Sequence, residues 1–159
     1  KIMSNSFQIT PLPYEQFAPL FAMSDPELRT LGMRRMTVDE NPGFPCRASL
    51  VDAEVGETVL LLPYMHHDVS SPYRASGPIF IRKDAETARP AVDEVPVMLR
   101  HRLLSVRAYD ELATMFDADV VPGSDLEVVM RRIFTNMCVR YLHIHNARPG
   151  CFNCRVDRV

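Results

Sequence analysis

Residues 141–157 read YLHIHNARPGCFNCRVD, and they decide how the rest of the chain is interpreted. Polar and apolar residues alternate up to Asn146, and a Pro-Gly turn signal follows at 149–150. Alternation beside such a turn predicts a β-hairpin, here with strands at residues 139–146 and 151–156. The fold should therefore contain an antiparallel sheet that ends in this hairpin.

The hairpin should have two chemically different faces, because side chains alternate across a strand. With residues 147–150 as the loop, His145 pairs with Phe152 and His143 pairs with Cys154. One face then carries Tyr141, His143, His145, Phe152, Cys154 and Val156. The other carries Leu142, Ile144, Asn146 and Cys151. We expect the first face to be polar, and the aliphatic residues of the second to point into the core.

A helix should cover the aliphatic face. Residues 125–136 hold apolar side chains at helical spacing, which predicts an amphipathic helix, the main one of the chain. Ser124 and Glu127 have the spacing of a capping box, in which a hydroxyl and a carboxylate cap the first turn. The same pattern at Ser24 predicts a shorter helix at 25–31. Residues 14–23 also have helical spacing, but a proline should keep that helix irregular.

The remaining segments predict strands and loops. Residues 46–51 and 57–65 should form a second hairpin, whose apolar second strand is central and covered on both faces. Pro63 lacks an N–H donor and should mark a bulge or the end of pairing. Residues 83–96, rich in charge and proline, should form an exposed loop before a helical turn at 97–103. Further strands are expected at 7–12, 33–38, 78–82, 104–109 and 114–121.

These elements predict an α+β fold in one domain, with a mostly antiparallel sheet and two or three helices on one face. The length of 159 residues suits a single domain that spans the whole chain. Two residues precede the first methionine, so residues 1–6 are expected to be a flexible tail or an addition left from expression.

Composition and charge exclude several classes of protein. Hydrophobic residues make up 47% and charged residues 24%, which argues against disorder. The net charge of −2 gives no reason to expect nucleic acid or an anionic membrane as a partner. Apolar stretches fall short of the ~20 residues of a membrane helix, and no signal peptide is apparent, so we expect a cytoplasmic protein. The common nucleotide and hydrolase motifs are absent, and no cofactor is predicted.

The cysteines allow a metal interpretation. H-x-H followed by C-x-x-C contains the ligand types of a zinc site, either with four ligands or as an open site at His143, His145 and Cys154. The predicted pairing places Cys151 on the opposite face, so four ligands would need a broken strand. We therefore predict no metal site and keep zinc binding as the third alternative. The four cysteines, which also include Cys46 and Cys138, should be free thiols.

Three groups of polar side chains lie at predicted strand ends and loops, and they are the candidates for a binding site. The groups are Cys46 with Arg47; Tyr64, His66, His67, Tyr73 and Arg74; and His143, His145, Asn146, Arg148 and Cys151. Arginine makes planar, bidentate contacts to carboxylate and phosphate. We expect these residues to line a pocket for a small anion or a carboxylate.

Whether such a pocket is catalytic stays open at this point. A nucleophile beside a base would be needed, and Cys46, His145 and Cys151 are the candidates. In the alternative, the same polar residues form a buried hydrogen-bond network that holds loops to the sheet. The function would then lie in a protein partner or an oligomer surface. The sequence indicates no oligomeric state.

The polar groups fall in blocks that resemble a known family. The blocks are Gly43-Phe44-Pro45-Cys46-Arg47, Asp52-Ala53 with Gly56-Glu57, Pro72-Tyr73-Arg74-Ala75, His145-Asn146-Ala147 with Gly150-Cys151-Phe152, and Arg155-Val156. They resemble the bacterial domain-of-unknown-function family numbered 1203, over residues 7–158. The resemblance implies a small bacterial protein and brings no activity, substrate or cofactor. That family has alanine where this chain has Cys154, which argues against a family-wide C-x-x-C role in zinc binding or redox chemistry.

Overall fold

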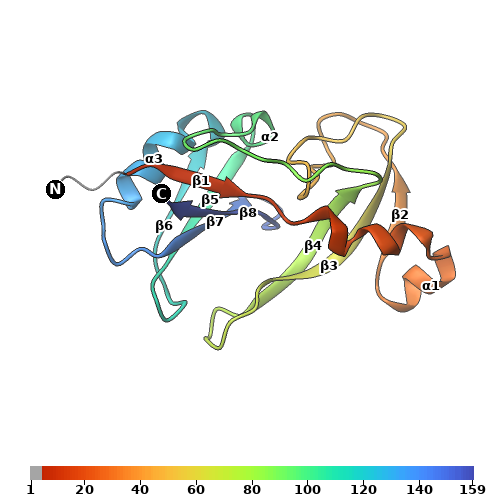
Figure 1. Ribbon diagram of the computed structural model, residues 1–159, viewed down its shortest axis with the longest axis horizontal. Helices are drawn as coiled ribbons and strands as arrows, with labels where there is room; N and C mark the ends of the chain where they lie inside the picture. Colours follow the sequence, from red (N-terminus) through yellow and green to blue (C-terminus); the bar gives the residue numbers. More distant parts are fainter. Residues whose placement is uncertain (1–4) are drawn as a thin grey trace.

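Two antiparallel sheets form the frame of the molecule (Figure 1). The structure is a computed structural model that describes residues 5–159. Its larger sheet has the strand order β1 (Phe7–Thr10), β8 (Phe152–Arg158), β7 (Tyr141–Asn146), β5 (Leu103–Tyr109) and β6 (Met115–Pro122). Its smaller sheet has the order β2 (Arg34–Thr37), β3 (Thr58–His67) and β4 (Ala75–Arg82). The predicted α+β class is confirmed, although the strands form two sheets instead of one.

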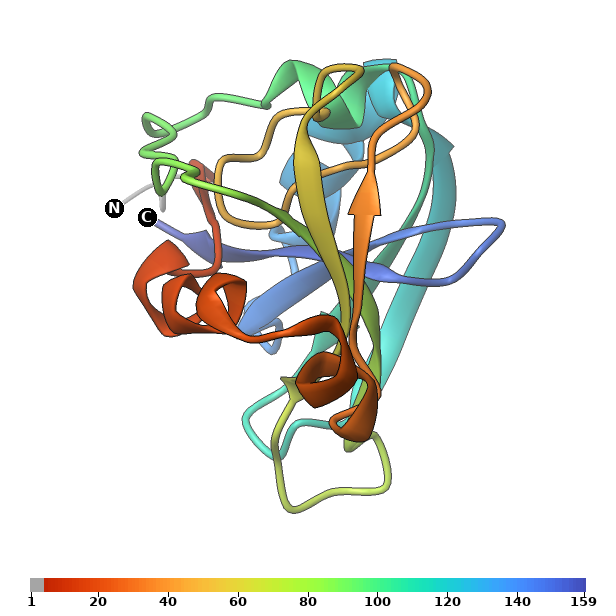
Figure 2. The ribbon, with the colours of Figure 1, turned by 90° about the vertical axis from the view of Figure 1, so that its right-hand side faces the viewer.

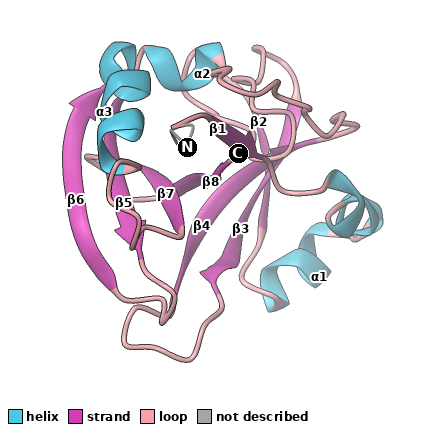
Figure 3. Ribbon diagram, turned by 60° about the vertical axis from the view of Figure 1, so that its left-hand side comes forward, coloured by secondary structure: helices cyan, strands magenta, loops and turns pink. Residues whose placement is uncertain are grey.

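The helices are short and lie beside both sheets. In chain order they are the 3-10 helices η1 (Tyr14–Gln16) and η2 (Ala18–Ala22), then α1 (Asp25–Thr30), α2 (Val97–Arg100), the 3-10 helix η3 (Gly123–Asp125) and α3 (Leu126–Ile133). Figure 3 shows α2 and α3 beside the larger sheet and α1 beside the smaller one. No helix within residues 5–159 is long and apolar enough to cross a membrane. The predicted N-terminal tail comprises residues 1–6, and residues 1–4 of it lie outside the part that the structure describes.

One predicted capping box is present and the other is absent. Ser24 Oγ accepts a hydrogen bond from Glu27 N at 3.3 Å, and Ser24 N donates to Glu27 Oε2 at 2.8 Å. The prediction for Ser124 is wrong, because η3 places this residue inside a helical turn instead of before one. Gly123 also packs tightly against α2, since a Cβ there would lie 1.8 Å from Leu99 O. The start of α3 is therefore set by this contact.

The predicted hairpin of residues 46–51 and 57–65 is wrong. Strand β3 pairs with β2 and β4, whereas residues 46–51 turn and make only an isolated parallel bridge between Cys46 and Phe80. Pro63 does not end the pairing, because it lies opposite Pro78 within the ladder. Pairing two prolines leaves neither strand with an unmatched N–H donor at that position. The irregularity of β3 comes later, between Tyr64 and His67.

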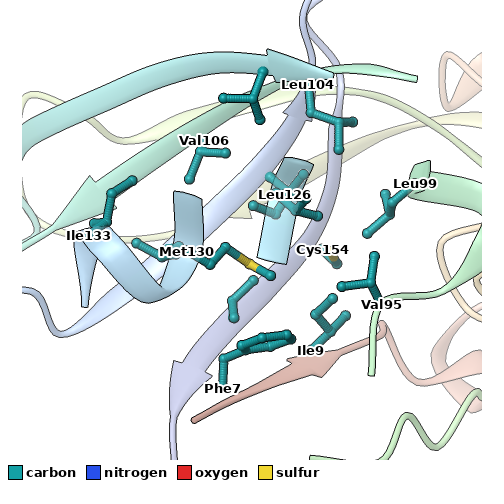
Figure 4. Close-up of a cluster of buried hydrophobic side chains, with 14 of the residues drawn as sticks. Phe7, Ile9, Val95, Leu99, Leu104, Val106, Leu126, Met130, Ile133 and Cys154 are labelled. Atoms are coloured by element: carbon teal, nitrogen blue, oxygen red, sulfur yellow. The ribbon is translucent and has the colours of Figure 1, made fainter. Parts of the chain in front are cut away.

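Helix α3 packs on one face of the larger sheet and builds the main core (Figure 4). Its Leu126 and Met130 are fully buried, as are Leu142 and Ile144 of β7. The prediction that these two aliphatic residues point into the core beside the main helix is confirmed. The opposite face of β7 is buried too, because it faces β3 of the smaller sheet.

A bulge changes the register of the C-terminal hairpin. His145 pairs with Phe152 as predicted, but Ile144 pairs with Cys154, so β8 holds one extra residue between these pairs, Asn153. The predicted pairing of His143 with Cys154 is therefore wrong. An extra residue exchanges the faces of the strand beyond it. Cys154 consequently joins the aliphatic core under α3 (Figure 4). It therefore lies on the opposite face of the hairpin from the histidines.

Candidate functional site

Arg47 lies between the two sheets because its backbone is bound on both sides. Its N–H donates to Phe80 O of β4 at 3.1 Å, and its carbonyl accepts from Leu12 N at 3.0 Å. The preceding residue, Cys46, bridges to β4 as well. These contacts direct the Arg47 side chain toward β8.

The Arg47 side chain is fully buried, at 0% exposure. Its Nε donates to Phe152 O at 2.7 Å, and its Nη1 donates to Pro45 O at 2.5 Å. Its Nη2 has no hydrogen-bond partner among residues 5–159. Burial lowers the pKa of Arg47, while the nearby sulfurs of Cys151 and Cys46 act in the opposite direction. Arginine keeps its charge under such conditions, so the site contains a buried cation with one unmatched nitrogen.

A cavity of about 480 Å³ opens beside Arg47. Its polar wall consists of Arg47, Arg102, Asn146, Arg148 and Cys151. Its remaining wall is largely apolar and consists of Gly43, Pro45, Phe80, Leu103 and Pro149. The loop of the β7–β8 hairpin, which supplies several of these residues, extends to the edge of the molecule (Figure 2). The cavity thus combines an open rim with a buried charge.

The three arginines of the cavity differ in how they are neutralised. Arg102 makes a two-pronged ion pair with Asp52, with Nη2–Oδ1 at 2.5 Å and Nη1–Oδ2 at 2.9 Å. Arg148 is exposed in the hairpin loop and makes no ion pair with any described residue. Arg47 donates to two carbonyl oxygens, which carry no full charge, and it also interacts with the Cys151 sulfur beside it. Two uncompensated positive charges therefore face the cavity.

Cys151 is held in a defined polar environment at the hairpin tip. Its sulfur accepts a hydrogen bond from Asn146 Nδ2 at 3.2 Å. The amide of Asn146 is itself oriented, because its Oδ1 accepts from Asn153 Nδ2 at 2.8 Å. Asn153 is the bulge residue of β8, so the bulge helps to direct the amide donor at Cys151. Cys151 is partly exposed, unlike the buried Cys46 and Cys154.

The histidines form a separate cluster between the sheets. The ring of His66 lies 5.0 Å from that of His145 and is stacked on Phe152 at 5.2 Å. His143 lies 4.9 Å from His67, whose Nε2 contacts Tyr141 Oη at 2.6 Å. These residues do not line the cavity. Phe152 joins the two regions, because its ring is stacked on His66 and its carbonyl oxygen accepts from Arg47 Nε.

Three of the histidines are neutral at pH 7. Burial, helped by neighbouring positive groups, lowers the pKa of His143 to about 2, of His145 to about 3 and of His66 to about 4. Each also has one ring nitrogen without a hydrogen-bond partner in the described chain. No set of three His, Cys, Asp or Glu side chains within residues 5–159 is arranged to hold a metal ion. The zinc site at His143, His145 and Cys154 is excluded by register, because Cys154 points to the other face.

The structure brings together only part of the predicted site. Arg47, Asn146, Arg148 and Cys151 line one cavity. The predicted residues that lie elsewhere are Cys46, Tyr64, His66, Tyr73, Arg74, His143 and His145. Among them, Arg74 is exposed and forms an ion pair with Asp68. Buried Cys46 accepts weak bonds from backbone N–H groups. The polar groups therefore divide into a cavity and a histidine cluster.

Sequence reasoning did not find the part of the cavity that β4 and β5 contribute. Phe80, Arg102 and Leu103 line it. Phe80 falls in an apolar strand pattern, whereas Arg102 and Leu103 fall in a segment predicted to be a helical turn. The only local signal was Asp52, which lies in one of the quoted blocks and bonds Arg102.

Comparison with known proteins identifies one family. A family described as "Protein of unknown function (DUF1203)" matches residues 43–158. This range includes every residue that lines the cavity. Searches of curated proteins and of solved structures gave no match.

Proposed function

The chain belongs to the DUF1203 family of proteins of unknown function, and from the geometry of its cavity we propose that it binds a small molecule with a carboxylate or similar anionic group. The apolar part of that molecule lies against Phe80, Leu103 and Pro149. A volume of about 480 Å³ is in the range of small-molecule sites. The protein is thus a binding protein for a small amphipathic acid.

The observation that carries this proposal is the unmatched Nη2 of Arg47. A buried donor without a partner costs roughly 1–3 kcal/mol, and more when the group is charged. An anionic oxygen in the cavity is the partner that removes this cost, through a charge-assisted hydrogen bond. The neighbouring charge of Arg148 favours the same ligand, whereas Arg102 is already neutralised by Asp52.

Calorimetric titration with acetate and hexanoate tests the proposal. Both probes carry the same carboxylate, but hexanoate adds methylene groups that can contact the apolar wall. We expect hexanoate to bind more tightly, by up to about 0.8 kcal/mol for each methylene that is buried. Arg148→Gln should weaken the binding of both acids, and Arg74→Gln, a change at an exposed arginine outside the cavity, should leave it unchanged. Absence of binding heat for hexanoate at roughly millimolar concentration would overturn the proposal.

A second function is favoured by the bonds of Arg47 to Phe152 O and Pro45 O. Through them one side chain joins the loop before β3 to β8, which is the loop-holding network of the non-enzymatic alternative. The two functions differ in the role of Arg47 Nη2. Under the binding function this nitrogen donates to an anion, whereas under the structural function it has no ligand. Under the structural function, hexanoate leaves the melting temperature unchanged; under the binding function, it raises it.

A further inference from the structure

We propose that Cys151 is a modification site, whose thiolate forms a covalent bond with a small carboxylic acid that carries an electrophilic carbon. Arg47 and Arg148 hold the carboxylate of this acid within reach of the sulfur. The inference rests on the proposed anion binding and adds the class of ligand and the reacting atom. It requires a cysteine that is accessible, polar in its surroundings and adjacent to the anion site.

Cys151 differs from the other three cysteines in these respects. Cys154 is fully buried in the aliphatic core, and burial raises its pKa to about 12, which keeps it a thiol. Cys46 is buried, and its sulfur accepts from Ser49 N and Arg82 N. Cys138 is exposed but lies outside the cavity. Only Cys151 is both partly exposed and part of the cavity wall.

A hydrogen-bond donor and a cation lie beside the Cys151 sulfur. Asn146 Nδ2 donates to it at 3.2 Å, in an orientation fixed by Asn153. The buried guanidinium of Arg47 attracts it, and its Nη2 is unmatched by any described residue. The thiolate is the nucleophilic form of cysteine, and positive charge and N–H donors beside the sulfur favour it. The cation that binds the ligand thus also lies beside the nucleophile.

The proposed reaction is a simple displacement. The Cys151 thiol releases its proton to solvent, and the thiolate attacks the electrophilic carbon. A sulfur–carbon bond forms while the bond between that carbon and its leaving group breaks, and the leaving group departs with the electron pair. The carboxylate is unchanged and stays bound to Arg47 and Arg148. No oxidant or reductant is required.

Two alkylating probes separate this reaction from ordinary thiol chemistry. Iodoacetate and iodoacetamide react by the same displacement of iodide, but only iodoacetate carries a carboxylate. The native protein is treated with limiting amounts of each, digested, and alkylation is measured at each cysteine by fragment-ion mass spectrometry. We expect the ratio of iodoacetate to iodoacetamide rates to be about tenfold higher at Cys151 than at Cys138. Equal ratios at the two cysteines, or an unreactive Cys151, would overturn the inference.

Variants identify the source of the preference. Arg148→Gln, a change in an exposed loop, should lower the iodoacetate rate at Cys151 more than the iodoacetamide rate. Arg74→Gln should change neither rate. Excess hexanoate should protect Cys151 and leave Cys138 unaffected. A preference that persists undiminished in Arg148→Gln would contradict the assigned anion contact.

The proposed function and this inference can fail separately. Calorimetric binding of hexanoate tests the proposed function, whereas site-resolved alkylation of Cys151 tests the covalent step. If hexanoate binds but Cys151 shows no preference for iodoacetate, only the covalent inference is wrong. If hexanoate does not bind, the proposed function is wrong, and the inference falls with it.

Discussion

The Nε of Arg47 donates a hydrogen bond to the carbonyl oxygen of Phe152 at 2.7 Å, across 105 positions of sequence. This bond places the guanidinium beneath the tip of the β7–β8 hairpin, next to Cys151. It also explains why a loop before β3 and the C-terminal hairpin line the same cavity. The cavity and its buried charge therefore depend on one long-range contact.

Loss of that contact should destabilise the protein. Arg47→Met leaves two buried carbonyl oxygens without donors, and we expect the free energy of unfolding to fall by about 3 kcal/mol. Arg47→Lys should not restore it, because an ammonium cannot reproduce the forked geometry. Urea unfolding measures both, and Arg74→Met, at an exposed ion pair, should change stability by no more than about 0.5 kcal/mol. Equal effects at positions 47 and 74 would contradict the structural role of Arg47.

Stability should fall as the pH drops below about 6.5. The pKa values of His143 and His145 are lowered by burial to about 2 and about 3, from an ordinary value of 6.5. The unfolded chain therefore binds protons that the native protein does not bind until much lower pH. Between pH 7 and pH 5 we expect a loss of about 1–2 kcal/mol for each of these histidines.

Urea unfolding at several pH values measures this loss. His143→Phe keeps a ring in the cluster but removes one titrating group, so its pH dependence should be weaker than that of the natural protein. Arg74→Gln, at an exposed ion pair outside the cluster, should keep the full dependence. A stability that stays constant from pH 7 to pH 5 would mean that the histidines are not buried as described.

The hairpin bulge can be tested at Cys154. In the observed register this residue lies in the aliphatic core under α3, fully buried. Cys154→Ser should lower stability by roughly 1–3 kcal/mol, because a hydroxyl there has no hydrogen-bond partner. Cys154→Ala removes only the sulfur and should cost less. If Cys154→Ala destabilised the protein more than Cys154→Ser, the result would favour the register without a bulge, in which residue 154 faces the histidines.

Gly123 should be required at the start of α3. A Cβ at this position would lie 1.8 Å from Leu99 O, so Gly123→Ala forces α2 and η3 apart. We expect a loss of more than about 2 kcal/mol in thermal or urea unfolding. Gly77 in β4 has no atom within 4 Å of such a Cβ, so Gly77→Ala is the matched control. Similar, small effects of both changes would contradict the close packing of η3 on α2.

Local patterns were enough to predict most of the elements. Alternation beside a Pro-Gly turn predicted β7 and β8, and the periodicity of 125–136 predicted α3, which is shorter at Leu126–Ile133. Such patterns indicate which side chains of one short segment are buried. The bulge at Asn153 has no such signal, and it reversed the predicted faces of Cys154 and Val156.

The candidate site was predicted in part, because polar residues at strand ends are visible in the sequence and their long-range partners are not. Asn146, Arg148 and Cys151 are close to each other in the chain and remained together in the cavity. Arg74 looked equivalent to Arg47, but its partner is the nearby, exposed Asp68. The strands β3 and β7 enclose the histidines, and this packing of two sheets could not be inferred from a single predicted sheet.

The central claim is that the unmatched guanidinium nitrogen of Arg47 binds an anion. The most direct measurement is the nitrogen-15 NMR spectrum of the arginine side chains during titration with hexanoate. We predict saturable shifts of the Arg47 and Arg148 guanidinium signals, with those of Arg74 unchanged. If the Arg47 signal stays constant while hexanoate reaches saturation in calorimetry, the anion binds elsewhere and the account is contradicted.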